Sequence, residues 1–339
     1  MIKGAIEKVV ERVDLEEEEM VAVMNEIMEG KAKPSQISAF LTAIRMKGEC
    51  IDEITGAASV MREKCLSITP EDPDTIDLCG TGGDSKGTFN VSTAASIIAA
   101  GAGVSIAKHG NRSVSSSVGS ADVLEELGVN IDLSPDQAEQ CLNKTGITFL
   151  FAPLYHPAMK NVAEPRRELG IRTIFNILGP MTNPAGVKNQ VMGIYSELLL
   201  EPIAKSLRNL GSVRAMLVHG FDGTDELTVT GKTHVAELKE GIVKTYQIDP
   251  SDVGLAKHSL EDIKGGGAKE NAQIILAILR GEEKGAKRDI AALNAAAGIM
   301  VANKAEDLKE ALEAANEAIE SKKALNKLNE LVSFTRAFG

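Results

Sequence analysis

A chain of 339 residues is long enough for about two domains, and its 43% hydrophobic and 25% charged residues are ordinary for a globular protein. Its net charge of −11 argues against general nucleic-acid binding, which needs a cationic surface, but not against small anionic ligands. Its four cysteines form no C-x-x-C pair, no apolar stretch reaches the ~18–20 residues of a membrane span, and MIKGAIEKVVERVD is no signal peptide. We therefore expect a reduced, soluble, cytoplasmic protein that partners neither a membrane nor nucleic acid.

Residues 1–65 show the apolar periodicity of helices throughout. Asp14 and Glu17 predict a capping box ahead of the first strongly periodic run, which stops at Gly30. The predicted helices cover about 15–28, 35–48 and 51–64. We expect a small helical bundle that packs or dimerises and has no chemistry of its own.

From about residue 75 the pattern changes to strands alternating with helices. Apolar runs bounded by glycines predict strands at 75–79, 104–108, 147–151 and 214–220. Ser92 or Thr93 is expected to cap the helix after the first strand, and the strand–helix–strand order implies a parallel sheet. After residue 226 the chain alternates like β hairpins and then becomes helical and alanine-rich.

The predicted fold class is α/β, with a small N-terminal α-helical domain and a large α/β domain. The large domain is expected to hold a mostly parallel central sheet surrounded by helices. We place the helical domain at 1–70, joined by part of 160–185, and the α/β domain at 71–339.

The stretch DLCGTGGDSKGTFNVSTAA at 77–95 places four glycines between the first strand and its helix. Backbone amides in such a loop can approach an anion closely. Two familiar phosphate loops are excluded, because Thr88 stands where a Walker A loop needs lysine and Ser85 stands where the dinucleotide fingerprint needs its third glycine. The loop therefore predicts a phosphorylated ligand of another kind.

A second loop, KHGNRSVSSSVGS at 108–120, follows the next predicted strand. Lys108, His109, Arg112 and the serine hydroxyls suit the charge and the oxygens of a phosphate, although a serine-rich loop is also typical of a solvated turn. Ser120 is expected to cap the following helix. Together with the glycine-rich loop, it suggests a ligand with two separated anionic groups.

The third loop, HGFDGTDELT at 219–228, brings Asp222, Asp225 and Glu226 close together after a strand. Acidic residues are common in turns, but paired carboxylates also suit Mg²⁺ held together with substrate phosphates. Because ligands of open α/β sheets bind at the carboxyl ends of the strands, the three loops together predict a Mg-bound diphosphate ligand.

Several motifs, in order along the chain, resemble the anthranilate phosphoribosyltransferase family. They are GTGGD (80–84), NVST (90–93), KHGNRSVSS (108–116), GSADVLEELG (119–128), HPAMKNVAEPRRELGIRTIFNILGPMTNP (156–184) and DGTDE (222–226). The resemblance covers nearly the whole chain and implies a nucleoside phosphorylase-like fold. It implies a Mg²⁺-dependent glycosyltransferase of tryptophan biosynthesis that transfers phosphoribosyl from phosphoribosyl pyrophosphate to the amine of anthranilate and releases pyrophosphate. It also implies a homodimer, which we expect to form through the N-terminal helices.

The resemblance also implies site residues. Phosphoribosyl pyrophosphate is expected to contact Gly80, Gly83, Asp84, Thr88, Asn90, Val91, Ser92, Thr93, Lys108, His109, Gly110, Asn111, Arg112, Ser113, Val114, Ser115, Ser116 and Ser120. Anthranilate is expected to contact Gly80, Asn111, His156, Arg166 and Pro180. Mg²⁺ is expected to bind Ser92, Asp225 and Glu226. Val118 departs from the small polar residue common in the family, which affects a local hydrogen bond and not the assignment.

The implied chemistry needs positioning more than a strong base, because the aniline nitrogen of anthranilate is already neutral at pH 7. His109 or His156 could accept the proton late, but we favour for each a role as a wall or hydrogen-bond donor. Arg166 is expected to bind the anthranilate carboxylate, with its neighbour Arg167 as the rival.

Two other functions remain open at this point. A nucleoside phosphorylase of the same fold would carry Lys-x-Ser-x-Arg after the second strand, whereas KHGNR has Gly110 at the serine position. A non-catalytic homologue that binds nucleic acid would lack the acidic pair and have a basic surface, whereas this chain has Asp225, Glu226 and a net charge of −11.

Overall fold

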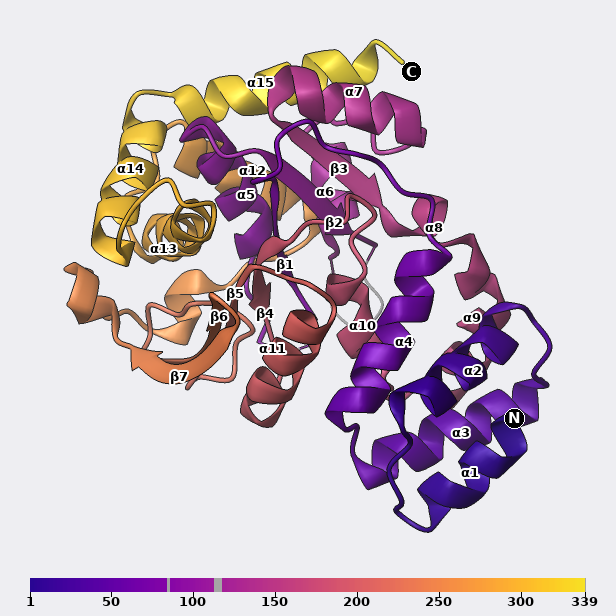
Figure 1. The fold of residues 1–339 in the computed structure, drawn as a ribbon. Coiled ribbons are helices and arrows are strands. Elements are labelled where there is room, and N and C mark those ends of the chain that lie inside the picture. Colours follow the sequence, from indigo (N-terminus) through magenta and orange to yellow (C-terminus); the bar gives the residue numbers. More distant parts are fainter. Residues whose placement is uncertain (84–85, 113–117, 339) are drawn as a thin grey trace.

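The computed structural model describes residues 1–83, 86–112 and 118–338, in which a group of N-terminal helices adjoins a larger α/β region (Figure 1). The N-terminal helices are α1 (Ile2–Val10), α2 (Glu17–Met28), α3 (Pro34–Lys47) and α4 (Ile51–Glu63). Their buried faces, with side chains such as Met24, Ile27 and Phe40, form one hydrophobic core. No helix in the described ranges is long and apolar enough to cross a membrane.

The described part of the larger region contains a seven-stranded sheet in the order β3-β2-β1-β4-β5-β6-β7. Its strands are β1 (Ile76–Gly80), β2 (Ile106–Gly110), β3 (Ile147–Phe151), β4 (Asn189–Gly193), β5 (Arg214–Gly220), β6 (Thr233–Lys239) and β7 (Ile242–Ile248). Neighbours from β3 to β5 in this order are parallel, and β6 and β7 form an antiparallel hairpin. The prediction of a mostly parallel sheet is confirmed.

Strand β4 was not predicted from the sequence. Its five residues, NQVMG, include two amides and a glycine, so they lack the apolar run that marked the other parallel strands. The strand is nevertheless fully buried, because it lies between β1 and β5 in the middle of the sheet. Its insertion makes β1 and β5 second neighbours and brings Gly193 next to Gly80.

Helices surround the sheet (Figure 1). They are α5 (Val91–Gly101), α6 (Ser120–Glu126), α7 (Pro135–Thr145), α11 (Leu200–Asn209), α12 (Ala268–Leu279), α13 (Ala286–Val301), α14 (Leu308–Glu320) and α15 (Lys323–Arg336). Alternate strand residues enter two cores, as the period of a β-strand requires. Leu78 and Met216 belong to the core with α5 and α13, whereas Cys79 and Leu217 belong to the core with α11 and the N-terminal helices.

The segment between β3 and β4 returns to the N-terminal helices. It contains α8 (Ala152–Tyr155), α9 (Lys160–Leu169) and α10 (Phe175–Met181). Val162 and Ile177 are fully buried in the core of the N-terminal helices, and the Asn161 amide donates to the Met28 carbonyl at 2.7 Å. This segment therefore joins the helical group to the sheet. Single 3₁₀ turns occur at η1 (Pro157–Met159), η2 (Glu197–Leu199), η3 (Pro250–Val253) and η4 (Leu260–Ile263).

Three predicted helix caps are wrong by one to three residues. Helix α2 is capped at Glu16, whose N–H donates to Glu19, because the predicted cap Asp14 instead accepts from Lys47. Helix α5 begins after Asn90, so Ser92 and Thr93 lie inside its first turn. Helix α6 begins after the extended residue Gly119, which makes Ser120 its first residue rather than its cap. The position of a helix cap is set by the backbone conformation of a single residue, and the pattern of apolar side chains does not predict that conformation.

Candidate active site

A cavity of about 840 Å³ opens where β1 and β2 end, between the sheet and the segment that contains α9 and α10. Residues expected to contact phosphoribosyl pyrophosphate that line it are Gly80, Gly83, Thr88, Asn90, Val91, Ser92, Lys108, His109, Gly110, Asn111, Arg112 and Ser120. The predicted anthranilate residues Gly80, Asn111, His156, Arg166 and Pro180 also line it, as do the predicted metal residues Ser92, Asp225 and Glu226. Residues from five separate segments thus meet around one space.

Some predicted residues are not among those that line the cavity. Thr93 is 1% exposed and lies in the buried part of the first turn of α5. Asp84, Ser113, Val114, Ser115 and Ser116 lie outside the described residues.

The glycine-rich loop is pressed against the acidic loop. A Cβ on Gly80 would lie 2.6 Å from the Asp225 carboxylate, and a Cβ on Gly193 would lie 1.6 Å from the Asp225 carbonyl oxygen. The Gly82 N–H donates to the same carboxylate at 2.8 Å. These glycines are therefore needed so that Asp225 can approach β1 and β4, in addition to any approach by a ligand.

Asp222 organises the acidic loop from within. Its carboxylate accepts hydrogen bonds from the hydroxyls of Thr224, Thr228 and Thr230 at 2.6–2.7 Å. Burial acts to raise the pKa of Asp222, but these hydrogen bonds outweigh it and lower the pKa. The Asp222 carboxylate thus serves the structure of the loop.

The Asp225–Glu226 pair and the Ser92 hydroxyl fit a hard divalent cation. All three lie on the wall of the cavity and offer oxygen atoms from two separate loops. Asp225 is only 8% exposed, and its carboxylate also accepts from the Gly82 N–H, which fixes it beside the glycine-rich loop. The donor set therefore suits Mg²⁺ shared with substrate phosphates.

Lys108 supplies positive charge at the floor of the cavity. Its ammonium donates to the Leu78 carbonyl at 2.7 Å and to the Ser92 hydroxyl at 3.3 Å, and the residue is 4% exposed. Burial lowers the pKa of Lys108, although nearby negative charge, foremost Asp77, acts in the opposite direction. Because the carbonyl and the hydroxyl that hold the Lys108 ammonium carry no net charge, its positive charge remains available to an anionic ligand.

Arg112, the other cation of this loop, has a different environment. Its guanidinium forms ion pairs with Glu125 at 2.5 Å and Asp122 at 2.9 Å on α6, and these raise its pKa. A phosphate at Arg112 would have to share it with these carboxylates.

His109 and His156 lie next to each other in the wall of the cavity, with their ring centroids 5.1 Å apart. Burial lowers the pKa of His109 to about 3 and that of His156 to about 4, so both are neutral at pH 7. Each ring is hydrogen-bonded to a backbone carbonyl, of Gly179 and Thr182 respectively, and Nε2 of each has no partner among the described residues. Two neutral acceptor nitrogens therefore border the cavity. Because Nε2 of each ring is an acceptor, the hydrogen-bond donor role expected for these histidines does not fit this geometry.

The two candidate arginines of α9 differ in position. Arg166 is half-buried, lines the cavity and lies with Cζ 5.1 Å from the centre of the Phe175 ring. Burial lowers its pKa, and no other cause is resolved. Arg167 is exposed and does not line the cavity. The geometry thus distinguishes Arg166, the residue expected at the anthranilate carboxylate, from its rival Arg167.

Asn271 is a cavity residue that the sequence analysis missed. It comes from α12, and its amide donates to the Asn90 side chain at 2.9 Å. Its oxygen accepts from the Gly266 N–H, and a Cβ on Gly265 would lie 2.4 Å from that oxygen. The run GGG at 265–267 was the available signal, because consecutive glycines before a helix indicate a close approach.

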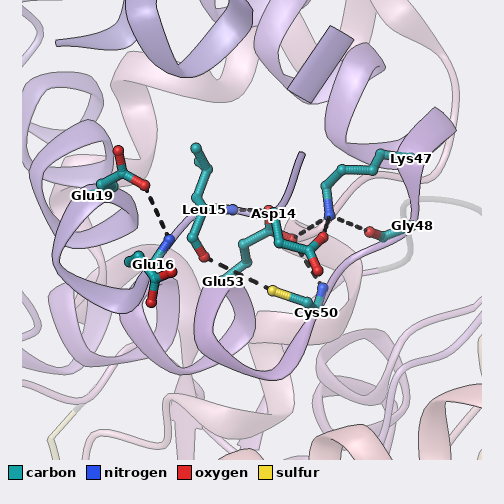
Figure 2. A network of polar contacts seen from close by, with 8 residues as sticks. All are labelled: Asp14, Leu15, Glu16, Glu19, Lys47, Gly48, Cys50 and Glu53. Atoms are coloured by element: carbon teal, nitrogen blue, oxygen red, sulfur yellow. Dashed lines mark hydrogen bonds and ion pairs between the residues drawn. The ribbon is translucent and has the colours of Figure 1, made fainter. Parts of the chain in front are cut away.

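A second polar cluster lies among the N-terminal helices, and its residues do not line the cavity (Figure 2). Asp14, Cys50 and Glu53 place potential metal-ligand atoms within 4.8 Å of one another. The Lys47 ammonium already binds this group, at 2.5 Å from Asp14 and 3.0 Å from Glu53. Burial raises the pKa of Cys50 to about 11, so its sulfur is a thiol. The cluster is an ion-pair network centred on the Lys47 ammonium.

Comparisons with known proteins agree with this arrangement. Residues 72–325 match the α/β domain of the glycosyl transferase family, and residues 3–65 match the helical bundle domain of that family. The anthranilate phosphoribosyltransferase of Alkaliphilus metalliredigens is 55% identical over 313 residues, which are 92% of each chain.

Solved structures with the same name are similar along their whole length. That of Thermus thermophilus is 43% identical, with a TM-score of 0.93 over 98% of this chain and 99% of its own. That of Saccharomyces cerevisiae, in complex with PRPP (phosphoribosyl pyrophosphate) and Mg, is 29% identical, with a TM-score of 0.89 over 99% of this chain and 98% of its own. The yeast enzyme has also been solved with 4-fluoroanthranilate, with a TM-score of 0.84 at 29% identity over 95% of this chain and 92% of its own.

Proposed function

The chain belongs to the glycosyl transferase family, among its anthranilate phosphoribosyltransferases, and from that premise we propose the following reaction. The chain transfers the phosphoribosyl group of phosphoribosyl pyrophosphate to the amine of anthranilate, with Mg²⁺, and releases pyrophosphate. The observation that carries this proposal is the meeting of Lys108, the Asp225–Glu226 pair and Arg166 around one cavity. A cation, two carboxylates and a separate guanidinium suit a Mg-bound diphosphate beside an aromatic carboxylate.

At the phosphate end, the chain holds the diphosphate by amides, hydroxyls and one ammonium. Negative charge grows on the leaving pyrophosphate as the anomeric carbon gains oxocarbenium character. Lys108, fixed at the cavity floor by Leu78 and Ser92, is a donor in place before the reaction begins. Mg²⁺ held by Ser92, Asp225 and Glu226 would add electrostatic stabilisation of the same charge.

At the anthranilate end, Arg166 binds the carboxylate and orients the ring. Its guanidinium is held against Phe175 and can meet a carboxylate bidentately. The neutral Nε2 atoms of His109 and His156 border the same space and can accept N–H groups of the substrate. Because the amine is already a neutral nucleophile, rate depends on holding it against the anomeric carbon.

The remaining parts of the proposal concern the setting and the other residues of the site. Asp84 and 113–116 complete the phosphate loops. The reaction serves tryptophan biosynthesis in the cytoplasm. Residues 1–70, with part of 160–185, act as a helical domain through which two copies associate, and residues 71–339 form the α/β domain.

Gly110 weighs against a nucleoside phosphorylase. That rival needs a serine at this position, and a Cβ on Gly110 would lie 2.2 Å from the Ser120 hydroxyl and 2.7 Å from the Phe149 ring. A side chain at position 110 would therefore fit only if the side chains of Ser120 and Phe149 moved.

The test is an assay of anthranilate fluorescence with phosphoribosyl pyrophosphate and Mg²⁺, run beside an assay of pyrophosphate. We expect anthranilate to disappear and pyrophosphate to appear in equal amounts, and both to stop when a chelator removes the metal. Phosphorolysis of thymidine or uridine without added Mg²⁺, with no loss of anthranilate, would overturn the proposal.

A further inference from the structure

The sheet is split beneath the cavity, between β1 and β2. Strand β1 pairs with β4 along all five residues, and β2 pairs with β3 along all five. Between β1 and β2, in contrast, the recorded pairing in the described residues is Ile76 with Ile106, at the far end of the strands. The strands are neighbours, but their ladder stops before the cavity.

The backbone N–H and C=O groups that would form the next hydrogen bonds between β1 and β2 are bound by side chains instead. Extending the parallel pattern by two residues would join the Leu78 N–H to the Ala107 carbonyl and the His109 N–H to the Leu78 carbonyl. In the structure the Ala107 carbonyl accepts from the Asn183 amide at 2.8 Å, and the His109 N–H donates to the Asp77 carboxylate at 3.3 Å. The Leu78 carbonyl accepts from the Lys108 ammonium at 2.7 Å.

Asp77 and Asn183 form the centre of this split. The Asn183 amide donates to the Asp77 carboxylate at 2.8 Å, and its own oxygen accepts from the Ala185 N–H at 2.8 Å. Asp77 is 0% exposed and Asn183 is 5% exposed. We call this pair the wedge, because its side chains fill the place where the backbones would otherwise meet.

The directions of these hydrogen bonds require a carboxylate at position 77. Asp77 accepts from the His109 N–H on one side and from the Asn183 amide on the other, so both of its oxygens must be acceptors. An asparagine there would turn an NH₂ group toward a donor. Rotating Asn183 to meet it would set its oxygen against the Ala107 carbonyl and its NH₂ against the Ala185 N–H. The nearby Lys108 opposes, without cancelling, the effect of burial, which raises the pKa of Asp77 to about 6.

The split also creates the seat of Lys108. If the ladder continued, the His109 N–H would occupy the Leu78 carbonyl, and the ammonium of Lys108 would lose its closest partner. The ring of His109 has a separate anchor on Gly179 and does not depend on the split in this way. Thus the wedge controls the phosphate end of the cavity more than the anthranilate end.

We infer that Asp77 and Asn183 are positioning residues of the transfer reaction: they hold β1 and β2 apart so that the Leu78 carbonyl can hold the Lys108 ammonium toward the substrate phosphates. Neither residue lines the cavity, so both act through Lys108. The inference rests on the proposed function, because it assumes that the anion in the cavity is phosphoribosyl pyrophosphate.

The test measures binding of phosphoribosyl pyrophosphate with Mg²⁺ by calorimetry, and the KM for anthranilate, in Asp77→Asn. We expect Kd for phosphoribosyl pyrophosphate to rise roughly 10- to 100-fold, as for other supporting residues of charged sites, while the KM for anthranilate stays near that of the parent.

Thr145→Val is the matched control for lost stability. It removes hydrogen bonds at 2.8 Å to the Cys141 and Ile147 carbonyls, at the end of β3 remote from the cavity. We expect a lower unfolding midpoint and an unchanged Kd. If Asp77→Asn behaves like Thr145→Val, with less stability and the parent Kd, the wedge is merely structural and the inference is wrong.

A second variant covers the case in which Asp77→Asn does not fold. Asp77→Ala/Asn183→Ala removes the wedge and lets the freed backbone groups of β1 and β2 pair with each other. We expect this variant to fold, to protect the His109 amide from hydrogen exchange more strongly, and to bind phosphoribosyl pyrophosphate weakly. Parent affinity in this variant would overturn the inference. A parent chain that binds no phosphoribosyl pyrophosphate would instead overturn the proposed function.

Discussion

Lys47 and Lys108 both have ammonium groups bound inside the protein, and the groups that surround them differ. The side chain of Lys47 is 4% exposed, and Lys108 as a whole is 4% exposed. Lys47 touches two carboxylates directly, Asp14 and Glu53, whereas Lys108 touches a carbonyl and a hydroxyl. The carboxylate with the largest electrostatic effect on Lys108 is that of Asp77, and it accepts hydrogen bonds from the His109 N–H and the Asn183 amide.

The pKa values follow this difference. Burial acts to lower the pKa of Lys47, but Asp14 and Glu53 outweigh it and the pKa is raised. Burial lowers the pKa of Lys108, and the opposing effect of Asp77 is too small to reverse it. A lysine in contact with carboxylates has its charge neutralised and stabilises the fold, whereas a lysine held by neutral oxygens has charge left for a ligand. The two regions should therefore respond to mutation in opposite ways.

The largest effect is expected at the acidic loop beside Lys108. Asp225→Asn/Glu226→Gln removes both carboxylates proposed to bind Mg²⁺. A bound metal ion supplies several kcal/mol of transition-state stabilisation, so turnover should fall on the order of 10³-fold. Initial rates at saturating substrate and Mg²⁺ measure this, with thermal unfolding as the check that the variant is folded. A nearly normal rate would refute the metal role of the pair.

Lys47→Met should do the reverse. Removing the ammonium leaves Glu53, at 0% side-chain exposure, without its cation, and such a loss typically costs about 3–5 kcal/mol of the free energy of unfolding. Urea titration measures this cost. Both KM values should stay at those of the parent, and a changed KM with unchanged stability would break the comparison.

Arg166→Ala tests the other end of the cavity. Loss of a charged hydrogen bond to the anthranilate carboxylate should raise the KM for anthranilate roughly 10- to 100-fold and leave that for phosphoribosyl pyrophosphate nearly unchanged. Arg167→Ala is the matched control, because Arg167 is exposed on the same helix and away from the cavity. Equal small effects from both variants would sink the assignment.

Acid sensitivity should reside in the cavity region. His109 and His156 have folded pKa values of about 3 and about 4 against 6.5 when unfolded, so the unfolded state binds more protons between these limits and stability falls as pH falls below 6.5. Asp77, with its pKa raised by burial to about 6 from 3.8, opposes this below pH 6, but a single group acts against two.

His156→Asn isolates one of these contributions. It keeps a donor for the Thr182 carbonyl and removes the titrating ring, so the loss of stability between about pH 7 and pH 4.5 should shrink on the order of 2 kcal/mol. Urea midpoints at both pH values measure this. An unchanged difference between the two midpoints would show that His156 does not remain neutral in the folded chain.

The parts of the fold that could be predicted from the sequence are those with a strong local pattern. The apolar runs ITFLF and RAMLVHG predicted β3 and β5 with the observed bounds. NQVMG has no such pattern, because β4 is specified by its two neighbours rather than by its own residues.

The candidate site shows the same limit. Loops with unusual composition identified most of the cavity wall, since glycines, a lysine and paired carboxylates stand out in any context. Asp77, Asn183 and Asn271 did not stand out, because their roles depend on partners that lie far along the chain, such as Asn183 for Asp77 and Asn90 for Asn271. Sequence motifs contained Asn183 without indicating what it does.

The most direct measurement is calorimetric binding of phosphoribosyl pyrophosphate, with Mg²⁺, to the parent chain, Lys108→Met and Lys47→Met. Each lysine is exchanged for the same apolar side chain, so the two variants differ in which groups surround the lost charge. We expect Lys108→Met to lose most of the affinity and Lys47→Met, at a temperature where it is folded, to keep the affinity of the parent. Equal affinity in the two variants would contradict it.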